Sequence, residues 1–371
     1  MRLVAQKSLG IKLFESVRIT LLVGLAAVAI SCSNGAAPDS AVRTYRLGFS
    51  ATPPRLTTES VIQTINTWEP HADIALINQG VPWHALLNDT SAAELVRRDL
   101  KDLAVHYHGR GMPLIVEIDV TDGLARDREA PDLVALGRSI SEPAVQQKYR
   151  EYLAAVDSIL HPEYLGLAME VNLIRAIAPA SVYAAVVTMS AGGENTLVAQ
   201  NSAATRFVSV QVETAWGRLP DVGHFVGIDT ERADFPYIKA LGLSSYPYLA
   251  GFANPNDVPI DYYARLNSSS APALPMLVVE GGWSSGSVPG VTSSPQLQAQ
   301  WIKRQMEIAD RGALVAVTQI SFTDLDLSSY PAPPGSILSL FGLLGLVDVD
   351  FNPKPSLAEW DRAFARQLRA R

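Results

Sequence analysis

Eight short apolar segments, rich in β-branched residues, are the feature of this 371-residue chain that most limits how it can fold. Each ends in polar or aromatic residues, and the ends of successive segments lie 33 to 51 residues apart. That spacing fits a strand followed by a returning helix, a unit of about 30 residues or more. Strands that alternate with helices form a parallel sheet with helices outside, so eight units predict a single-domain (β/α)8 TIM barrel. The predicted strands are residues 45–50, 74–83, 114–122, 165–172, 207–216, 240–246, 276–283 and 314–322.

Helical patterns fill most of the gaps between these segments. The clearest begin at Ser91, which starts a capping-box pattern, and at Pro143. Another runs over 179–189, and we expect Gly192 and Gly193 to end it, because glycine is a poor helix former. The predicted helices are residues 91–109, 143–159, 179–189, 296–310 and 356–369, with weaker patterns at 232–239 and 260–266.

The first 31 residues have the character of a secretory signal peptide. Four basic residues precede an apolar run at 19–30, which is too short to span a bilayer, since that takes about 20 residues. Residues 29–32, Ala-Ile-Ser-Cys, resemble a bacterial lipobox, and this resemblance implies that Cys32 is lipidated and becomes the new N-terminus. We therefore expect a signal peptide (1–31), a flexible tether (32–44) and a barrel (45–371), anchored by lipid to a membrane of the bacterial cell envelope. The alternative is ordinary cleavage near Ser31 and a secreted or periplasmic protein.

The composition of the chain argues against several classes of function and several kinds of site. The net charge of −7 argues against nucleic-acid binding, which needs clustered Lys and Arg. One cysteine excludes an internal disulfide and a Cys-rich zinc site. The six histidines lack metal-ligand spacing, there is no Gly-x-Ser-x-Gly motif, and no dinucleotide fingerprint follows the first strand. We expect a monomer that needs no metal and no cofactor.

Carboxylates and aromatic residues gather at the predicted strand ends, where barrels of this kind build their active sites. Two carboxylates with several aromatic faces suit glycoside hydrolysis, which needs an acid and a nucleophile or base around one sugar carbon. Flat apolar faces of sugar rings also pack well on aromatic side chains. The residues at these ends are Trp83, Asp119, Asp122, Glu170, Asn172, Gln211, Glu213, Trp216, Tyr246, Tyr248, Glu280, Trp283 and Asp324.

Four segments sharpen this pattern into a family resemblance. They read LGLAMEVN at 165–172, GLSSYPY at 242–248, MLVVEGGW at 276–283 and GLVDVDFNPKP at 345–355. Together they resemble the clan-A ("4/7") retaining glycoside hydrolases, and most of all the arabinogalactan endo-β-1,4-galactanase family. The resemblance covers residues 45–366 in layout, but its specific motifs cover only about thirty residues.

The resemblance implies a role for each matching residue. Glu170 would be the general acid/base and Glu280 the nucleophile, with Tyr246 hydrogen-bonded to Glu280 and Trp283 stacked on a sugar. The substrate would be a β-linked, galactan-like poly- or oligosaccharide. The residues expected to bind it are Trp83, Asn172, Gln211, Trp216, Tyr246, Tyr248 and Trp283.

One residue departs from the family pattern. Met169 stands where the family has an Asn that holds a substrate hydroxyl, and a thioether is only a weak acceptor. Either Asn172 or Gln211 supplies this contact, or the substrate differs, or activity is weak or absent.

Several alternatives therefore stay open. Glu170 could be a barrel-core carboxylate paired to an Arg, and Glu213 is the second candidate for the acid. The chain could be a non-catalytic carbohydrate-binding lipoprotein on a degenerate hydrolase barrel. It could also be a different exported hydrolase that uses Asp119 and Glu213, although Asp119 and Asp122 suit the organisation of the third loop better.

Overall fold

The computed structural model describes residues 42–220, 222–267, 271–312, 314–332 and 336–369. The predicted signal peptide, Cys32 and all but the last residues of the tether lie outside this part of the chain. Within it, no helix is both long and apolar enough to cross a membrane.

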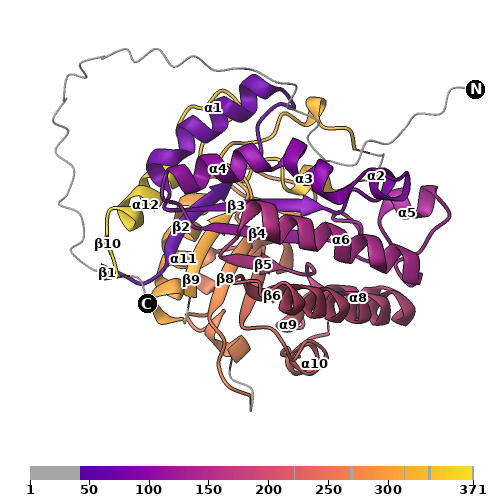
Figure 1. Cartoon of the computed structure of the whole chain (residues 1–371). Helices are drawn as coiled ribbons and strands as arrows, with labels where there is room; N and C mark the ends of the chain where they lie inside the picture. Colours follow the sequence, from indigo (N-terminus) through magenta and orange to yellow (C-terminus); the bar gives the residue numbers. More distant parts are fainter. Residues whose placement is uncertain (1–41, 221, 268–270, 313, 333–335, 370–371) are drawn as a thin grey trace, which may run out of the picture.

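Eight parallel strands close into one barrel, with each strand hydrogen-bonded to the next in chain order and the last to the first (Figure 1). This confirms the predicted (β/α)8 barrel. The strands are β2 (Arg46–Ser50), β3 (Ile74–Gly80), β4 (Leu114–Asp119), β5 (Tyr164–Gly166), β6 (Thr205–Gln211), β7 (Ala240–Ser245), β8 (Met276–Gly281) and β9 (Leu314–Gln319).

Several strands are shorter than we predicted. The segment 74–83 leaves the sheet at Gly80, and Trp83 begins the short helix α2 (Trp83–Leu87). The segment 165–172 pairs only as far as Gly166, and 207–216 ends at Gln211, before α9 (Val212–Ala215). Apolar content continues past these ends because the first residues of the βα loops pack over the barrel mouth, so composition alone overextends each strand.

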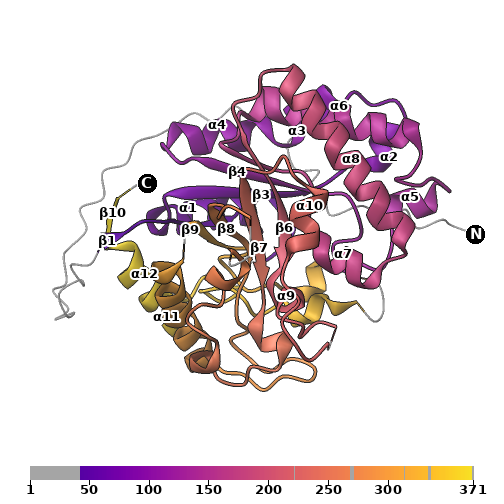
Figure 2. The same ribbon diagram turned by 90° about the horizontal axis from the view of Figure 1, so that it is seen from below.

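The helices surround the barrel (Figures 1 and 2). The pattern 91–109 forms two helices, which break at Leu100, and the weak pattern 260–266 forms only a 3-10 turn. The principal helices are α1 (Thr58–Trp68), α3 (Ala92–Asp99), α4 (Lys101–Gly109), α5 (Pro131–Ala135), α6 (Pro143–Leu160), α7 (Val171–Ile177), α8 (Ala180–Ala199), α10 (Asp229–Asp234), α11 (Pro295–Arg311) and α12 (Pro355–Phe364).

The prediction that Gly192 and Gly193 end their helix is wrong, because α8 runs through both to Ala199. A Cβ on Gly193 would lie 2.7 Å from Leu153 Cδ2 and 2.9 Å from Tyr149 Cε1 of α6. Gly193 therefore serves close packing between two helices, and the gain from this packing outweighs the poor helix propensity of glycine.

The barrel interior changes from apolar to polar along its axis. On β4, Ile115 belongs to an interior apolar cluster, whereas Leu114, Val116 and Ile118 pack with the helices outside. Because side chains alternate along a strand, Glu117 and Asp119 follow Ile115 on the inward face. The carboxyl end of the barrel is thus where its charged groups lie.

The two ends of the described chain meet beneath the barrel. The short strand β1 (Val42–Arg43) pairs in parallel with β10 (Gln367–Leu368), and both lie side by side in Figures 1 and 2. Arg43 binds Asp73 across 2.7 Å and so ties this pair to the chain segment before β3. Since β1 leads directly into β2, this junction lies at the amino ends of the strands.

Candidate active site

Glu170 lies four residues beyond β5 and caps the start of α7, with an unusual backbone. Its φ of 47° and ψ of 43° place it in the left-handed region, which non-glycine residues rarely adopt. Its N–H donates to Ser209 Oγ on β6, at 3.0 Å. Strained backbones of this kind are found at active sites, where the surroundings hold a side chain in one direction.

Glu280 lies near the end of β8, next to a register shift. Leu243 of β7 pairs with Val278, but the next residue, Ser244, pairs with Glu280, so Val279 is an extra residue in β8. Such a bulge re-aims the side chains that follow it. Tyr246, just after β7, donates its hydroxyl to Glu280 Oε1 at 2.7 Å, in agreement with the predicted contact.

The titration of Glu280 depends on its burial and on Glu170. Burial, and then the nearby Glu170 carboxylate, raise the pKa of Glu280 to about 8, while the hydrogen bond from Tyr246 and the charge of Arg126 oppose this rise. The structure thus brings together the two residues that the sequence singles out, although they lie 110 positions apart in the chain.

Arg126 is a central member of the site that sequence reasoning missed. Its Nε donates to Glu170 Oε2 at 2.8 Å, and its Nη1 donates to Asp119 Oδ1 at 2.6 Å and to Thr121 Oγ1 at 3.0 Å. Arg126 is only 4% exposed, and Glu170 and Asp119 are also buried. The expectation that Glu170 could pair with an Arg is met, and the expectation that Asp119 organises the third loop is met by the same contact.

Glu117 lies one inward position below Asp119 and is fully buried. Neither of its carboxyl oxygens makes a well-formed hydrogen bond. Burial raises the pKa of Glu117 well above its ordinary range, and the nearby Ser209 hydroxyl offsets this only in part. Gly166 makes room for it, because a Cβ there would lie 2.9 Å from Glu117 Cγ.

Asn172, Gln211 and Glu213 form a separate buried network beside the site. Asn172 exchanges two hydrogen bonds with the backbone of Gln211, and Gln211 Nε2 donates to Glu213 Oε2. Tyr262 and Ser245 donate to the other oxygen of Glu213, at 3.0 and 3.1 Å. Burial raises the pKa of Glu213 to about 7. The side chains of Asn172 and Gln211 are therefore both hydrogen-bonded within this network.

The predicted aromatic platform is mostly closed. Trp83 and Trp283 are each 1% exposed, and Tyr248 is 2% exposed. Trp283 packs between Tyr248 and Trp301, with ring centroids 5.8 Å away on each side. Neither Trp83 nor Trp283 thus offers an open ring face to a sugar, which corrects the expected stacking for this conformation.

Trp216 is the partly exposed member of the predicted aromatic set. Its ring stacks on Tyr262 at 5.0 Å and lies under Arg265, whose guanidinium carbon is 4.8 Å from the ring centroid. Its indole N–H donates to Tyr262 O at 3.0 Å. These contacts hold the ring of Trp216 directly after α9, beyond the carboxyl end of β6.

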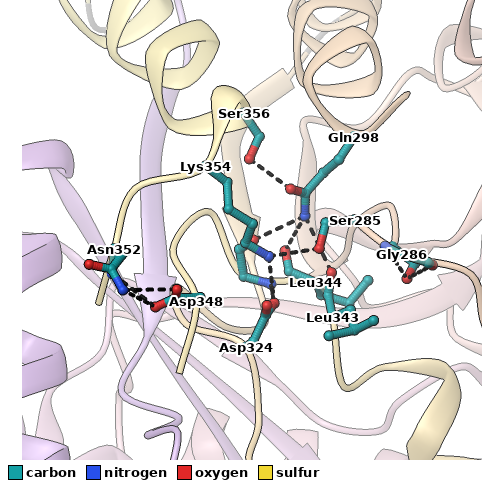
Figure 3. A network of polar contacts seen from close by, with 12 residues as sticks. Ser285, Gly286, Gln298, Asp324, Leu343, Leu344, Asp348, Asn352, Lys354 and Ser356 are labelled. Carbon is teal, nitrogen blue, oxygen red and sulfur yellow. Dashed lines mark hydrogen bonds and ion pairs between the residues drawn. The ribbon is translucent and has the colours of Figure 1, made fainter. Parts of the chain in front are cut away.

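A buried polar network fixes the loop that follows Glu280 (Figure 3). Lys354 Nζ, from the segment before α12, donates to Ser285 Oγ at 2.9 Å and to Asp324 Oδ1 at 2.6 Å. Gln298 of α11 donates to the carbonyls of Leu344 and Gly345, at 2.9 and 3.0 Å. Burial raises the pKa of Asp324 and lowers that of Lys354, while each charge opposes the effect on the other. The segment 345–355 thus acts as a brace for the loop after β8.

These contacts define what the site can do chemically. It presents two carboxyl groups at the carboxyl ends of β5 and β8, one hydrogen-bonded to an arginine and the other to a tyrosine. Such a pair can donate a proton to one oxygen and attack or stabilise one electron-poor carbon. Among the described residues, no group of three or more His, Cys, Asp and Glu side chains is arranged to hold a metal ion.

Comparison with known proteins shows similarity at the level of structure. No family model and no curated protein matches the sequence. The catalytic domain of an Ignisphaera aggregans GH53 protein superposes with a TM-score of 0.61 at 13% identity, covering 92% of this chain and 100% of that one. A Streptomyces cattleya GH5_18 protein, solved with GlcNAc, gives 0.64 at 15% identity, covering 89% and 82%.

A third solved structure is longer than this chain. The exo-β-1,4-mannosidase Op5Man5 from Opitutaceae bacterium strain TAV5 gives a TM-score of 0.63 at 15% identity, covering 87% of this chain. The chain spans 59% of the length of that mannosidase. At such low identity the shared property is the fold, and this chain has the (β/α)8 barrel fold that glycoside hydrolases of clan A also have.

Proposed function

We propose that this protein is a retaining glycoside hydrolase that cleaves a β-linked glycan with Glu170 and Glu280. The observation that carries the proposal is the meeting of these two carboxyl groups at the barrel mouth. Tyr246 donates to Glu280, and burial together with Glu170 raises the pKa of Glu280. With its pKa raised to about 8, Glu280 holds a proton near neutral pH, and the reaction uses one proton between the two carboxyl groups.

The proposed reaction follows a double displacement. Tyr246 holds Glu280 Oε1, which leaves Oε2 to attack the anomeric carbon while Glu170 protonates the departing glycosidic oxygen. The C–O bond to the leaving sugar breaks and a glycosyl ester forms on Glu280. Water then attacks the same carbon, Glu170 takes its proton, and Glu280 is released.

The buried setting of the pair bears on the substrate. The site residues Glu170, Tyr246 and Trp283 are almost fully covered, and Trp216 at the rim is more open. Such a site suits the end of a β-linked, galactan-like chain, or a short oligosaccharide, better than the middle of a polymer. The structural likeness to a β-1,4-mannosidase is compatible with this substrate class.

A comparison of wild type with Glu280→Ala on a panel of aryl β-glycosides and galactans tests the proposal. We expect wild type to turn over at least one sugar, and Glu280→Ala to lose about 10⁴-fold or more of kcat, because the covalent step disappears. Azide should restore turnover of an aryl glycoside by the variant, with inverted product. Absence of turnover by wild type on every sugar tested would overturn the proposal.

A second function is favoured by one contact and one substitution. The ion pair of Arg126 with Glu170 and the replacement of the expected Asn by Met169 suit a carbohydrate-binding lipoprotein on a degenerate hydrolase barrel. In that case isothermal titration should detect oligosaccharide binding that survives Glu280→Ala, while no sugar is hydrolysed.

We further propose that Cys32 carries a lipid anchor. The lipobox-like residues 29–32, after a basic and apolar leader, support this. Expressed in a bacterium, the wild-type protein should partition with membranes, and Cys32→Ser should release it to the soluble fraction. Membrane association that is unchanged in Cys32→Ser would contradict lipidation.

A further inference from the structure

Arg126 is placed between two carboxylates at the centre of the site. Through Nε it binds Glu170, and through Nη1 it binds both Asp119 and Thr121. The three charged side chains are each no more than 11% exposed, so solvent screens their interactions weakly. An isolated charge is costly at such a position, and a charge with two partners stays compensated if one partner leaves.

We propose that Arg126 is a positioning residue that decides which carboxyl of the Glu170–Glu280 pair carries the shared proton. Arg126 Nε forms an ion pair with Glu170 Oε2 at 2.8 Å, and this contact favours a resting pair in which the proton lies on Glu280. This inference rests on the proposed function, because it concerns the proton that the hydrolysis uses.

The resting arrangement is the reverse of what the first chemical step needs. Glu280 must be ionised to attack, and Glu170 must hold the proton that it gives to the leaving oxygen. The proton therefore has to move from Glu280 to Glu170, and the Arg126–Glu170 bond has to open when a sugar enters. Asp119 and Thr121 make this opening feasible, because Arg126 Nη1 stays hydrogen-bonded to them after the bond from Arg126 Nε to Glu170 breaks.

Asp119 favours the same distribution, because its charge adds to the rise in the pKa of Glu280 that burial and Glu170 cause. The charge of Arg126 opposes this rise without cancelling it, and burial raises the pKa of Glu117 beneath them well above its ordinary range. The titratable and charged groups that face the pair are Glu117 and Asp119 of β4, Arg126 of the following loop, Tyr246 after β7, and the two glutamates themselves. Among the described residues that face the pair, Arg126 is the cation.

Two substitutions should move the titration of the pair in opposite directions. Arg126→Gln removes the cation, so the pair should hold its shared proton to a pH about one unit or more higher, the usual effect of one charge at contact distance. Asp119→Asn removes a negative charge, so the titration should move to lower pH. Arg126→Lys, which keeps the charge, should stay closer to wild type. Arg128→Gln is the matched control, because Arg128 is exposed and pairs with Asp127.

Carbon-13 NMR of glutamate carboxyl groups measures these midpoints without substrate. Signals are assigned with Glu170→Gln and Glu280→Gln, and far-ultraviolet circular dichroism confirms that each variant is folded. The pH profile of kcat/KM on an active aryl glycoside should shift in the same directions. If wild type has no hydrolase activity but the NMR midpoints move as stated, the proposed function fails and the role of Arg126 stands. NMR midpoints that are equal in wild type, Arg126→Gln and Asp119→Asn would overturn the role of Arg126.

Discussion

The backbone at Glu170 shows how strongly a single position is constrained. A left-handed conformation costs an L-residue about 1–2 kcal/mol, and Glu170 adopts it although glycine would do so without this cost. This backbone conformation places the Glu170 side chain beside Arg126 and close to Glu280, a position that a glycine could not use because it has no carboxylate.

We predict that Glu170→Gly is more stable than Glu170→Ala by about 1 kcal/mol, because both variants lack the carboxylate but only glycine adopts φ of 47° without strain. At an ordinary helical position the order would be the reverse. Urea unfolding of the two variants measures the difference. Equal midpoints, or a more stable alanine variant, would show that the left-handed backbone is not strained.

Arg126 marks the limit of residue-level prediction. Glu170 and Glu280 stand out because each follows an apolar segment within a recognisable motif. Arg126 lies in the charged loop 122–129, which has the composition of a solvated surface, and no local pattern says that its side chain turns inward. Its partners Asp119 and Glu170 come together only when the barrel closes, so its role depends on tertiary structure.

At the scale of the elements, prediction succeeds where burial dictates the pattern. Parallel strands inside a barrel are covered on both faces, and they therefore appear as continuous apolar runs that are easy to find. The end of each strand is harder to predict, since loop residues over the barrel mouth are apolar as well. The sequence pattern also predicts too early an end for α8. Gly193 is required by close packing against α6, and this contact between distant segments is not visible in the local sequence.

Gly192 and Gly193 should respond in opposite ways to the same substitution. Gly193→Ala places a methyl group 2.7 Å from Leu153 and should destabilise the protein by about 1–3 kcal/mol through overpacking. Gly192→Ala meets nothing closer than 3.4 Å, in the flexible side chain of Arg150, and should stabilise α8 by about 0.5–1 kcal/mol. Thermal unfolding of both variants checks the prediction, and a stabilised Gly193→Ala variant would contradict the close packing of α6 and α8.

At the scale of the whole molecule, buried carboxyl groups link stability to pH. The pKa of Glu213 is raised to about 7 and that of Glu280 to about 8, from an ordinary value of 4.5. Between pH 4.5 and 8 the folded protein therefore holds protons that the unfolded chain releases. Stability must then be greatest at the acidic end of this window and fall as pH rises through it.

We expect the free energy of unfolding to be lower at about pH 8.5 than at about pH 5 by a few kcal/mol, since each unit of pKa shift corresponds to about 1.4 kcal/mol. Glu280→Gln should reduce this difference, because a neutral amide in that position no longer ionises, and its oxygen can still accept from Tyr246. Urea unfolding of wild type and Glu280→Gln at the two pH values measures this difference in the free energy of unfolding. A wild-type stability that is the same at both would contradict the raised pKa values.

The pairing of β1 with β10 gives the molecule an orientation. Both ends of the described chain leave from the amino ends of the barrel strands, and the two glutamates lie at the opposite, carboxyl end of the barrel. If Cys32 carries the proposed lipid, the ten residues before Val42 extend at most about 35 Å, so the barrel is held base-down near the bilayer. Its glutamates then face outward, toward glycans that approach from the surroundings rather than toward the lipid to which the protein is tethered.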